Sequence, residues 1–195
     1  MRRLRARLLA ALETPDRDED LIPAVGRAIE RVRGRPVRLC AVAFPPETAS
    51  GVWIDRTQSD ILAYERHTDP GHQLVIIGHE AWHMFQGHCS SLTAHGSVAT
   101  RAKDSADTAL RDLLEVLAAT EVPGAAGPAD RTAPRLHIAM RADAGTHREE
   151  DEAEFFGVRF ATSVQAALLA SRSSADTDNL AGRIQASMAH RIRRS

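Results

Sequence analysis

Hydrophobic residues recur at helical spacing in six segments of the chain, and short apolar runs lie between the second and the third. The helical segments carry the sets Leu4, Leu8 and Leu12; Ile22, Val25, Ile29 and Val32; Leu74, Ile77, Ala81 and Met84; Leu110, Leu113, Leu114 and Leu117; Ala153, Phe156, Phe160 and Val164; and Leu180, Ile184 and Met188. The apolar runs 37–44, 52–54 and 61–64 are typical of strands. We therefore expect an α+β fold in which a small antiparallel sheet packs on helices.

Length and composition are those of one ordinary domain. The chain has 195 residues, 43% of them hydrophobic, and a formal net charge of −1 at pH 7. We expect residues 1–195 to form a single domain with leading helices in 1–35, a core in 36–165 and C-terminal helices in 166–195. Because the net charge is close to zero, we expect no direct binding to nucleic acid.

No apolar run has the length of a secretory signal or a membrane span. The run that follows Arg7 ends at Glu13, which is too short for the apolar region of a signal peptide. The two cysteines, Cys40 in a predicted strand and Cys89, agree with a reducing compartment. We expect a cytoplasmic protein without a membrane partner.

The third helical segment contains a metal-binding motif, H-E-x-x-H, at residues 79–83. Asp69 suits the N-cap of this helix, Pro70 its first position and Gly87 its C-terminal stop. Two histidines four residues apart project from one helical face, so His79 and His83 can grip the same ion. A pair of core histidines is the alternative, but the helical context favours a Zn²⁺ site with one ion per chain.

The residue after the first histidine completes the chemistry of the motif. The carboxylate of Glu80 can reach a water on the ion without joining the ligands. A zinc ion held by three protein ligands keeps its fourth position for such a water, and Glu80 can accept its proton. The motif therefore predicts metal-assisted hydrolysis with Glu80 as the general base.

A third ligand must come from elsewhere in the chain. Gly87 and His88 do not fit the register in which metzincins supply a third histidine, whereas gluzincins use a glutamate on a later helix. Helix geometry favours Glu150 among the acidic residues that follow His147. His88 and Cys89 remain the alternatives.

The neighbouring carboxylates have other expected roles. Glu149 completes a capping box with Thr146, and Glu152 points to solvent. Glu154 shares the face of Glu150 and can orient a ligand imidazole from the second shell. A solvated, acidic helix start is the alternative for the whole group.

Two motifs resemble a known family. H-E-x-x-H followed by E-x-x-A-[DNE]-x-[FI]-[AG], matched by residues 150–157, is similar to the ImmA/IrrE-like metallopeptidases, and the resemblance extends over most of residues 35–165. It implies a zincin-like (gluzincin) fold with the motif on its central helix, zinc ligands His79, His83 and Glu150, and Glu80 as general base. It also implies a protein partner, either a helix-turn-helix repressor or an antitoxin.

The substrate-binding residues follow less directly. Tyr64, His72, His88 and His147 are candidate donors to an oxyanion or substrate, and each also has an ordinary structural role. The architecture that the resemblance implies pairs an extended substrate with the strand before the zinc helix, so 61–64 is the candidate edge. Trp82 replaces a common family glycine; it either packs in the core or narrows the cleft.

Three functions are compatible with these features. The first is a zinc endopeptidase of narrow specificity that acts on a protein or peptide substrate. The second is a zinc-stabilised regulatory or toxin-like binding protein without turnover. The third is a zinc-dependent enzyme that acts on a small molecule.

Overall fold

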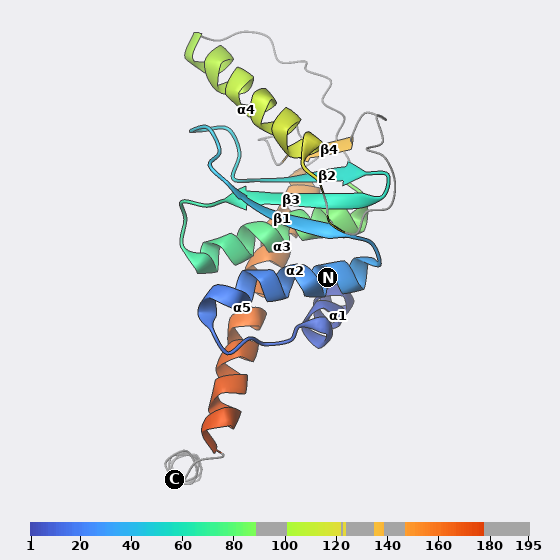
Figure 1. Cartoon of the computed structure of the whole chain (residues 1–195), viewed down its shortest axis with the longest axis vertical. Helices are drawn as coiled ribbons and strands as arrows, with labels where there is room; N and C mark the ends of the chain where they lie inside the picture. Colours follow the sequence, from blue (N-terminus) through green and yellow to red (C-terminus); the bar gives the residue numbers. More distant parts are fainter. Residues whose placement is uncertain (89–100, 122, 124–134, 139–146, 178–195) are drawn as a thin grey trace.

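The computed structural model describes residues 1–88, 101–121, 123, 135–138 and 147–177, and these form an α+β fold (Figure 1). The helices are α1 (Arg2–Ala11), α2 (Leu21–Arg33), α3 (Pro70–Gln86), α4 (Arg101–Ala119) and α5 (His147–Thr177), and the 3₁₀ turn η1 spans Asp18–Asp20. The strands are β1 (Val37–Val42), β2 (Gly51–Arg56), β3 (Ser59–Glu65) and β4 (Arg135–Ile138). The two leading helices and the helices at 70–86, 110–117 and 147 onward are confirmed. The predicted last helix, at 180–188, lies outside the described residues.

The four strands form one mixed sheet in the order β1-β3-β2-β4. β3 pairs in parallel with β1, and β2 pairs in antiparallel fashion with β3 and β4. The prediction of an antiparallel sheet is therefore wrong for one pair of strands. The hairpin of β2 and β3 turns β3 back between β2 and β1, so that β3 runs in the direction of β1.

This order also corrects the expected substrate edge. Residues 61–64 belong to β3, whose backbone is paired on both sides and whose residues 59–64 are all buried. A strand paired on both sides has no ladder left for a substrate. β4, which the apolar pattern did not predict, pairs with the other side of β2.

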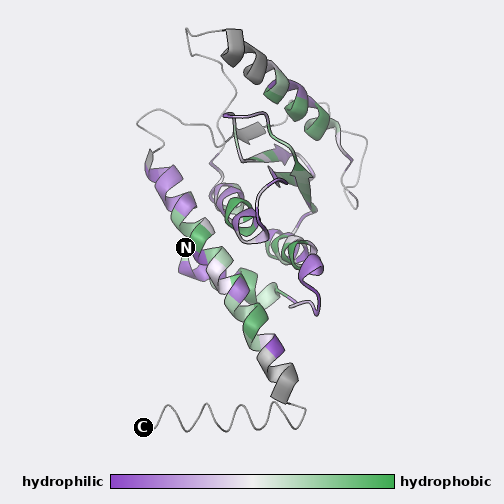
Figure 2. Ribbon diagram, turned by 90° about the vertical axis from the view of Figure 1, so that its left-hand side faces the viewer, coloured by the Kyte–Doolittle hydropathy of each residue, from purple (hydrophilic) through white to green (hydrophobic). Residues whose placement is uncertain are grey.

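Helices cover both faces of the sheet, as Figures 1 and 2 show. Trp53, Leu62 and Tyr64 pack toward α3 in a cluster that also includes residues of α1, α2 and α5. The opposite face packs on α4 through the residues Val52, Ile54, Ile61, Ala63, Leu110, Leu114 and Leu117. A sheet covered on both faces needs continuous apolar strands, which explains why β2 and β3 lack a polar alternation.

Local sequence sets both ends of α3. The Oδ1 atom of Asp69 accepts a hydrogen bond from the backbone N–H of His72 at 3.0 Å, and Pro70 stands at the first helical position. Gly87 ends the helix in the left-handed conformation, with φ of 71°. The predicted helix start and stop are confirmed, and they place the H-E-x-x-H motif in the second half of α3.

Across the described residues, no helix combines the length and the apolar character that a membrane span requires.

Candidate metal centre

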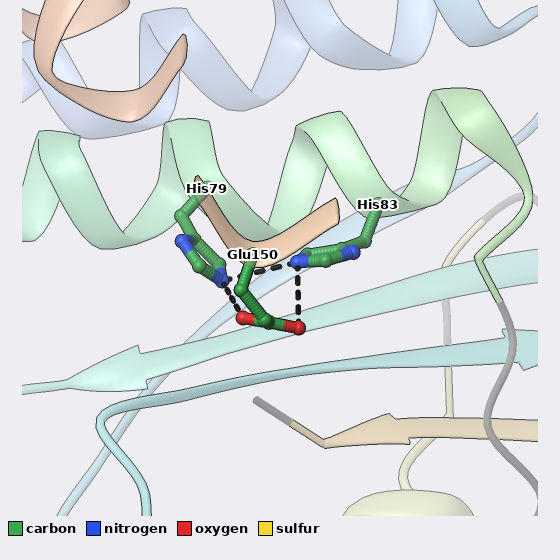
Figure 3. Close-up of side chains that lie close together, drawn as sticks. All are labelled: His79, His83 and Glu150. Carbon is green, nitrogen blue, oxygen red and sulfur yellow. Dashed lines mark hydrogen bonds and ion pairs between the residues drawn. The ribbon is translucent and has the colours of Figure 1, made fainter. Parts of the chain in front are cut away.

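Helix α3 places two imidazoles side by side. The Nε2 atoms of His79 and His83 lie 3.1 Å apart, as expected for one face of a helix (Figure 3). His83 is fully buried, whereas the side chain of His79 is 17% exposed. The pair therefore has one closed side and one side that reaches the surface.

Helix α5 supplies the carboxylate that completes the group. The Oε2 atom of Glu150 lies 3.3 Å from Nε2 of His79, and its Oε1 atom lies 3.5 Å from Nε2 of His83 (Figure 3). All three residues offer a ligand atom within 4.8 Å of the other two. The expected grouping of His79, His83 and Glu150 is thus present in the fold.

Two glycines bring α5 this close to α3. A Cβ atom on Gly157 would lie 2.5 Å from the backbone oxygen of Val75, and one on Gly78 would lie 3.0 Å from the Cα atom of Gly157. The two backbones are therefore in contact at the crossing, one residue before His79. Because Glu150 lies two turns before Gly157 on α5, this crossing sets the position of its carboxylate.

The three side chains fit a metal ion. A tetrahedral ion with ligand atoms about 2.0–2.1 Å away places neighbouring ligand atoms roughly 3.3–3.4 Å apart. The spacings of 3.1, 3.3 and 3.5 Å are close to that value. Two imidazole nitrogens and one carboxylate oxygen are also ligands that suit zinc and leave a fourth position for solvent or substrate.

His79, His83 and Glu150 lie close enough together to shift the pKa values of His79 and Glu150. Burial alone would raise the pKa of Glu150, but hydrogen bonds from His79 and His83 hold it well below its ordinary value. Burial alone would lower the pKa of His79, but the hydrogen bond to Glu150 and the charges of nearby carboxylates raise it. The arrangement favours a bound cation, whether protons or a metal ion.

The side chain of Glu80 packs between α3 and strand β2 of the sheet and is 1% exposed. A Cβ atom on Gly51, the first residue of β2, would lie 2.7 Å from Oε1 of Glu80. Only glycine leaves room for the carboxylate at this contact. The negative charge of Glu80 contributes to the raised pKa of His79, so the two groups lie within electrostatic reach.

The other acidic residues at the start of α5 are more peripheral. Glu154 is exposed, and its charge also acts on His79. Glu152 forms an ion pair with Arg148 at 3.2 Å. The expected capping box of Glu149 needs Thr146, which lies outside the described residues.

The candidate substrate donors lie in different places. Tyr64 is buried in the apolar cluster, where burial raises the pKa of its hydroxyl. His72 is exposed in the first turn of α3, about two helical turns before His79. The side chain of His147, like all of Cys89, is outside the described part of the chain. Trp82 packs in the core against Phe156, with ring centroids 5.0 Å apart.

One neighbour of the site was assigned a different role by sequence reasoning. The Nδ1 atom of His88 lies 3.3 Å from Nδ1 of His83, on the side opposite the other two ligands. Gly87 makes this contact possible, because its left-handed turn folds the next residue back toward the helix. The Gly-His pair one turn after the motif was the signal that could have indicated it.

No protein-family model, curated protein or solved structure matches this chain.

Proposed function

We propose that the protein is a zinc-dependent peptidase that hydrolyses a peptide bond in a specific protein partner. The observation that carries this proposal is the convergence of His79, His83 and Glu150 from two helices, with Glu80 next to the first ligand. The spacing of the ligand atoms, the two-histidine, one-carboxylate composition and the buried acid support it together.

The side chains have distinct parts in this chemistry. Bound zinc would supply a Lewis acid that brings the pKa of a coordinated water toward about 7. Glu80 accepts a proton from the attacking water and later returns it to the leaving nitrogen. The packing of β2 against Glu80 keeps bulk water from that carboxylate and holds it in one orientation.

The motifs and their spacing also support a choice of partner. Their resemblance to the ImmA/IrrE-like metallopeptidases, a zincin-like family, favours a helix-turn-helix repressor or an antitoxin as substrate. We expect this reaction in the cytoplasm, where such regulators act. The near-neutral charge of the chain agrees with recognition of protein rather than of DNA.

One experiment tests both parts of the proposal. Purified wild-type protein and Glu80→Gln are incubated with the helix-turn-helix regulator encoded nearest to the gene, and intact masses are followed with time. We expect about one zinc per chain in both proteins and cleavage only by the wild type. Cleavage by both would remove Glu80 as general base, and absence of zinc from the wild type would reject the metal site.

A second candidate function is a zinc-stabilised binding protein without turnover. The observation that favours it is the burial of Glu80, which is 1% exposed and covered by β2. In that case the regulator forms a stable complex with the wild type and with Glu80→Gln, and neither changes its mass. Removal of the zinc by a chelator would then weaken the complex, and the regulator would stay intact with and without zinc.

A further inference from the structure

The buried ligand His83 uses both of its ring nitrogens. Its Nε2 atom faces His79 and Glu150, and its Nδ1 atom faces Nδ1 of His88 at 3.3 Å. The rings of His83 and His88 meet edge to face, with centroids 5.4 Å apart and an interplanar angle of 67°. This geometry brings one ring nitrogen of His88 within hydrogen-bond distance of the His83 imidazole.

The positions of the ring hydrogens decide which of His83 and His88 donates the hydrogen bond. A neutral imidazole carries one N–H and one lone pair, so binding of a metal through Nε2 of His83 requires the hydrogen to lie on Nδ1. His83 is fully buried, and a buried N–H without an acceptor is costly. The Nδ1 atom of His88 is within reach and can accept only if its own hydrogen lies on Nε2.

We infer that His88 is a positioning residue, which accepts a hydrogen bond from Nδ1 of His83 and keeps Nε2 of His83 free for the metal. The inference rests on the proposed zinc site and gives His88 the orienting role that sequence reasoning assigned to Glu154. Second-shell acceptors of this kind fix the tautomer and the ring orientation of a ligand histidine.

The end of α3 holds His88 in place for this role. The backbone N–H groups of Gly87 and His88 both donate to the carbonyl oxygen of His83, at 2.9 and 3.1 Å. The backbone and side chain of His88 are therefore both tied to the same residue. A glycine stop that folds the chain back thus couples the helix terminus to the metal ligand.

Three variants separate orientation from packing. His88→Leu removes the acceptor, and His88→Asn places an amide oxygen close to the position of the lost Nδ1 atom. His67→Leu is the matched control, because His67 is an exposed histidine outside the proposed site. We expect zinc affinity, measured by chelator competition, to fall about 10- to 100-fold in His88→Leu, to recover largely in His88→Asn and to stay unchanged in His67→Leu.

A spectroscopic measurement reads the hydrogen bond directly. In zinc-loaded protein labelled with ¹⁵N-histidine, nitrogen-proton correlation spectra should show the hydrogen of His83 on Nδ1 and that of His88 on Nε2. His88→Leu should lose the protection of the His83 N–H from solvent exchange, and thermal unfolding of the metal-free variants shows whether each is folded.

Two results would overturn the inference while the proposed function stands. One is zinc affinity within twofold of wild type in folded His88→Leu, and the other is a lone pair on Nδ1 of zinc-bound His83. Wild-type protein that takes up no zinc would instead reject the proposed function, together with the inference that rests on it. Zinc binding with the expected variant order but without cleavage of any regulator would support the inference and leave only the peptidase proposal rejected.

Discussion

Two polar clusters lie close to α3, each with a fully buried member, Asp60 in the first and His83 in the second, and they differ in how their charges are balanced. In the first, the fully buried Asp60 accepts hydrogen bonds from Nε of Arg33 at 2.8 Å, Nε of Arg35 at 2.6 Å and Nε1 of Trp53 at 2.8 Å. In the second, the Nε2 atoms of His79 and His83 and the carboxylate of Glu150 converge on one another.

The difference is one of complementarity. Each named partner of Asp60 is an N–H donor, so the buried negative charge is balanced by the protein itself. In the second cluster, two imidazole nitrogens and a carboxylate face one another, and either protons or a metal ion must lie between them. We therefore expect the first cluster to act in stability and the second in metal binding.

The largest effect is expected from removal of a ligand imidazole. His83→Ala or His79→Ala should reduce zinc from about one per chain to nearly none, because two remaining ligands cannot hold the ion in competition with water. Elemental analysis after dialysis checks this. Exposed His67→Ala is the control, and full zinc in both ligand variants would break the distinction between the clusters.

The next effect belongs to the first cluster. Asp60→Ala removes the buried carboxylate that Arg33 and Arg35 share, although Arg35 keeps its ion pair with Asp55, and this should cost about 3–5 kcal/mol of unfolding free energy. The folded fraction should still bind about one zinc per chain. Denaturant unfolding of the metal-free protein gives the first number, and loss of zinc from well-folded Asp60→Ala would show that the clusters are not separate.

The carboxylates of α5 should follow in a definite order. Glu150→Ala should weaken zinc binding severely and Glu154→Ala less, while Glu149→Ala and Glu152→Ala should change it slightly. Glu149→Ala should instead cost about 1 kcal/mol of stability or less, as a lost cap. Chelator competition gives the order, and near-wild-type affinity in Glu150→Ala would move the third ligand elsewhere.

The contrast between the clusters also explains what the sequence could predict. In the second cluster, helical spacing placed His79 beside His83 by a local rule. Glu150 follows His83 by 67 residues, and the gluzincin pattern of a glutamate on a later helix indicated it, while helix geometry selected it among its neighbours. No such pattern indicated the first cluster, because Asp60 lies 27 residues from Arg33 and 25 from Arg35, and only the pairing of β1 with β3 brings them together.

The sheet order was missed for the same reason. Periodicity identifies a strand but not its neighbours, and residues 59–64 of β3 are all buried because helices cover both faces of the sheet. The short strand β4 carries too few residues for a pattern. His88 needed a further step, since its role depends on the left-handed turn at Gly87 and on the tautomer of His83.

A smaller effect is expected where α3 and α5 cross. Gly157→Ala places a methyl group 2.5 Å from the backbone oxygen of Val75, so α5 must move away and carry Glu150 with it. We expect a loss of about 1–3 kcal/mol in stability and roughly tenfold weaker zinc binding. Gly26→Ala is the matched control, because there the methyl group meets only the flexible side chain of Leu39. Equal zinc affinity in Gly157→Ala and wild type would mean that the crossing does not position the carboxylate.

The smallest expected effect is a maximum in stability with pH that only the second cluster, His79, His83 and Glu150, should show. In metal-free protein the pKa of His79 is raised, so its contribution to stability is full below about 6.5 and fades as the pH rises through the raised value. The pKa of Glu150 is lowered, so its contribution is full above about 4.3 and fades as the pH falls through the lowered value. The stability difference between wild type and Glu150→Gln should therefore be largest between about pH 4.3 and pH 6.5.

Asp60→Asn should show no such maximum. The hydrogen bonds from Arg35 to Asp60 and Asp55 raise the pKa of the Arg35 guanidinium above its ordinary value, so this group stays charged across the whole pH range. Denaturant unfolding from pH 4 to pH 8 checks this, and parallel pH profiles for the two variants would show that both clusters are held by the same kind of charge balance.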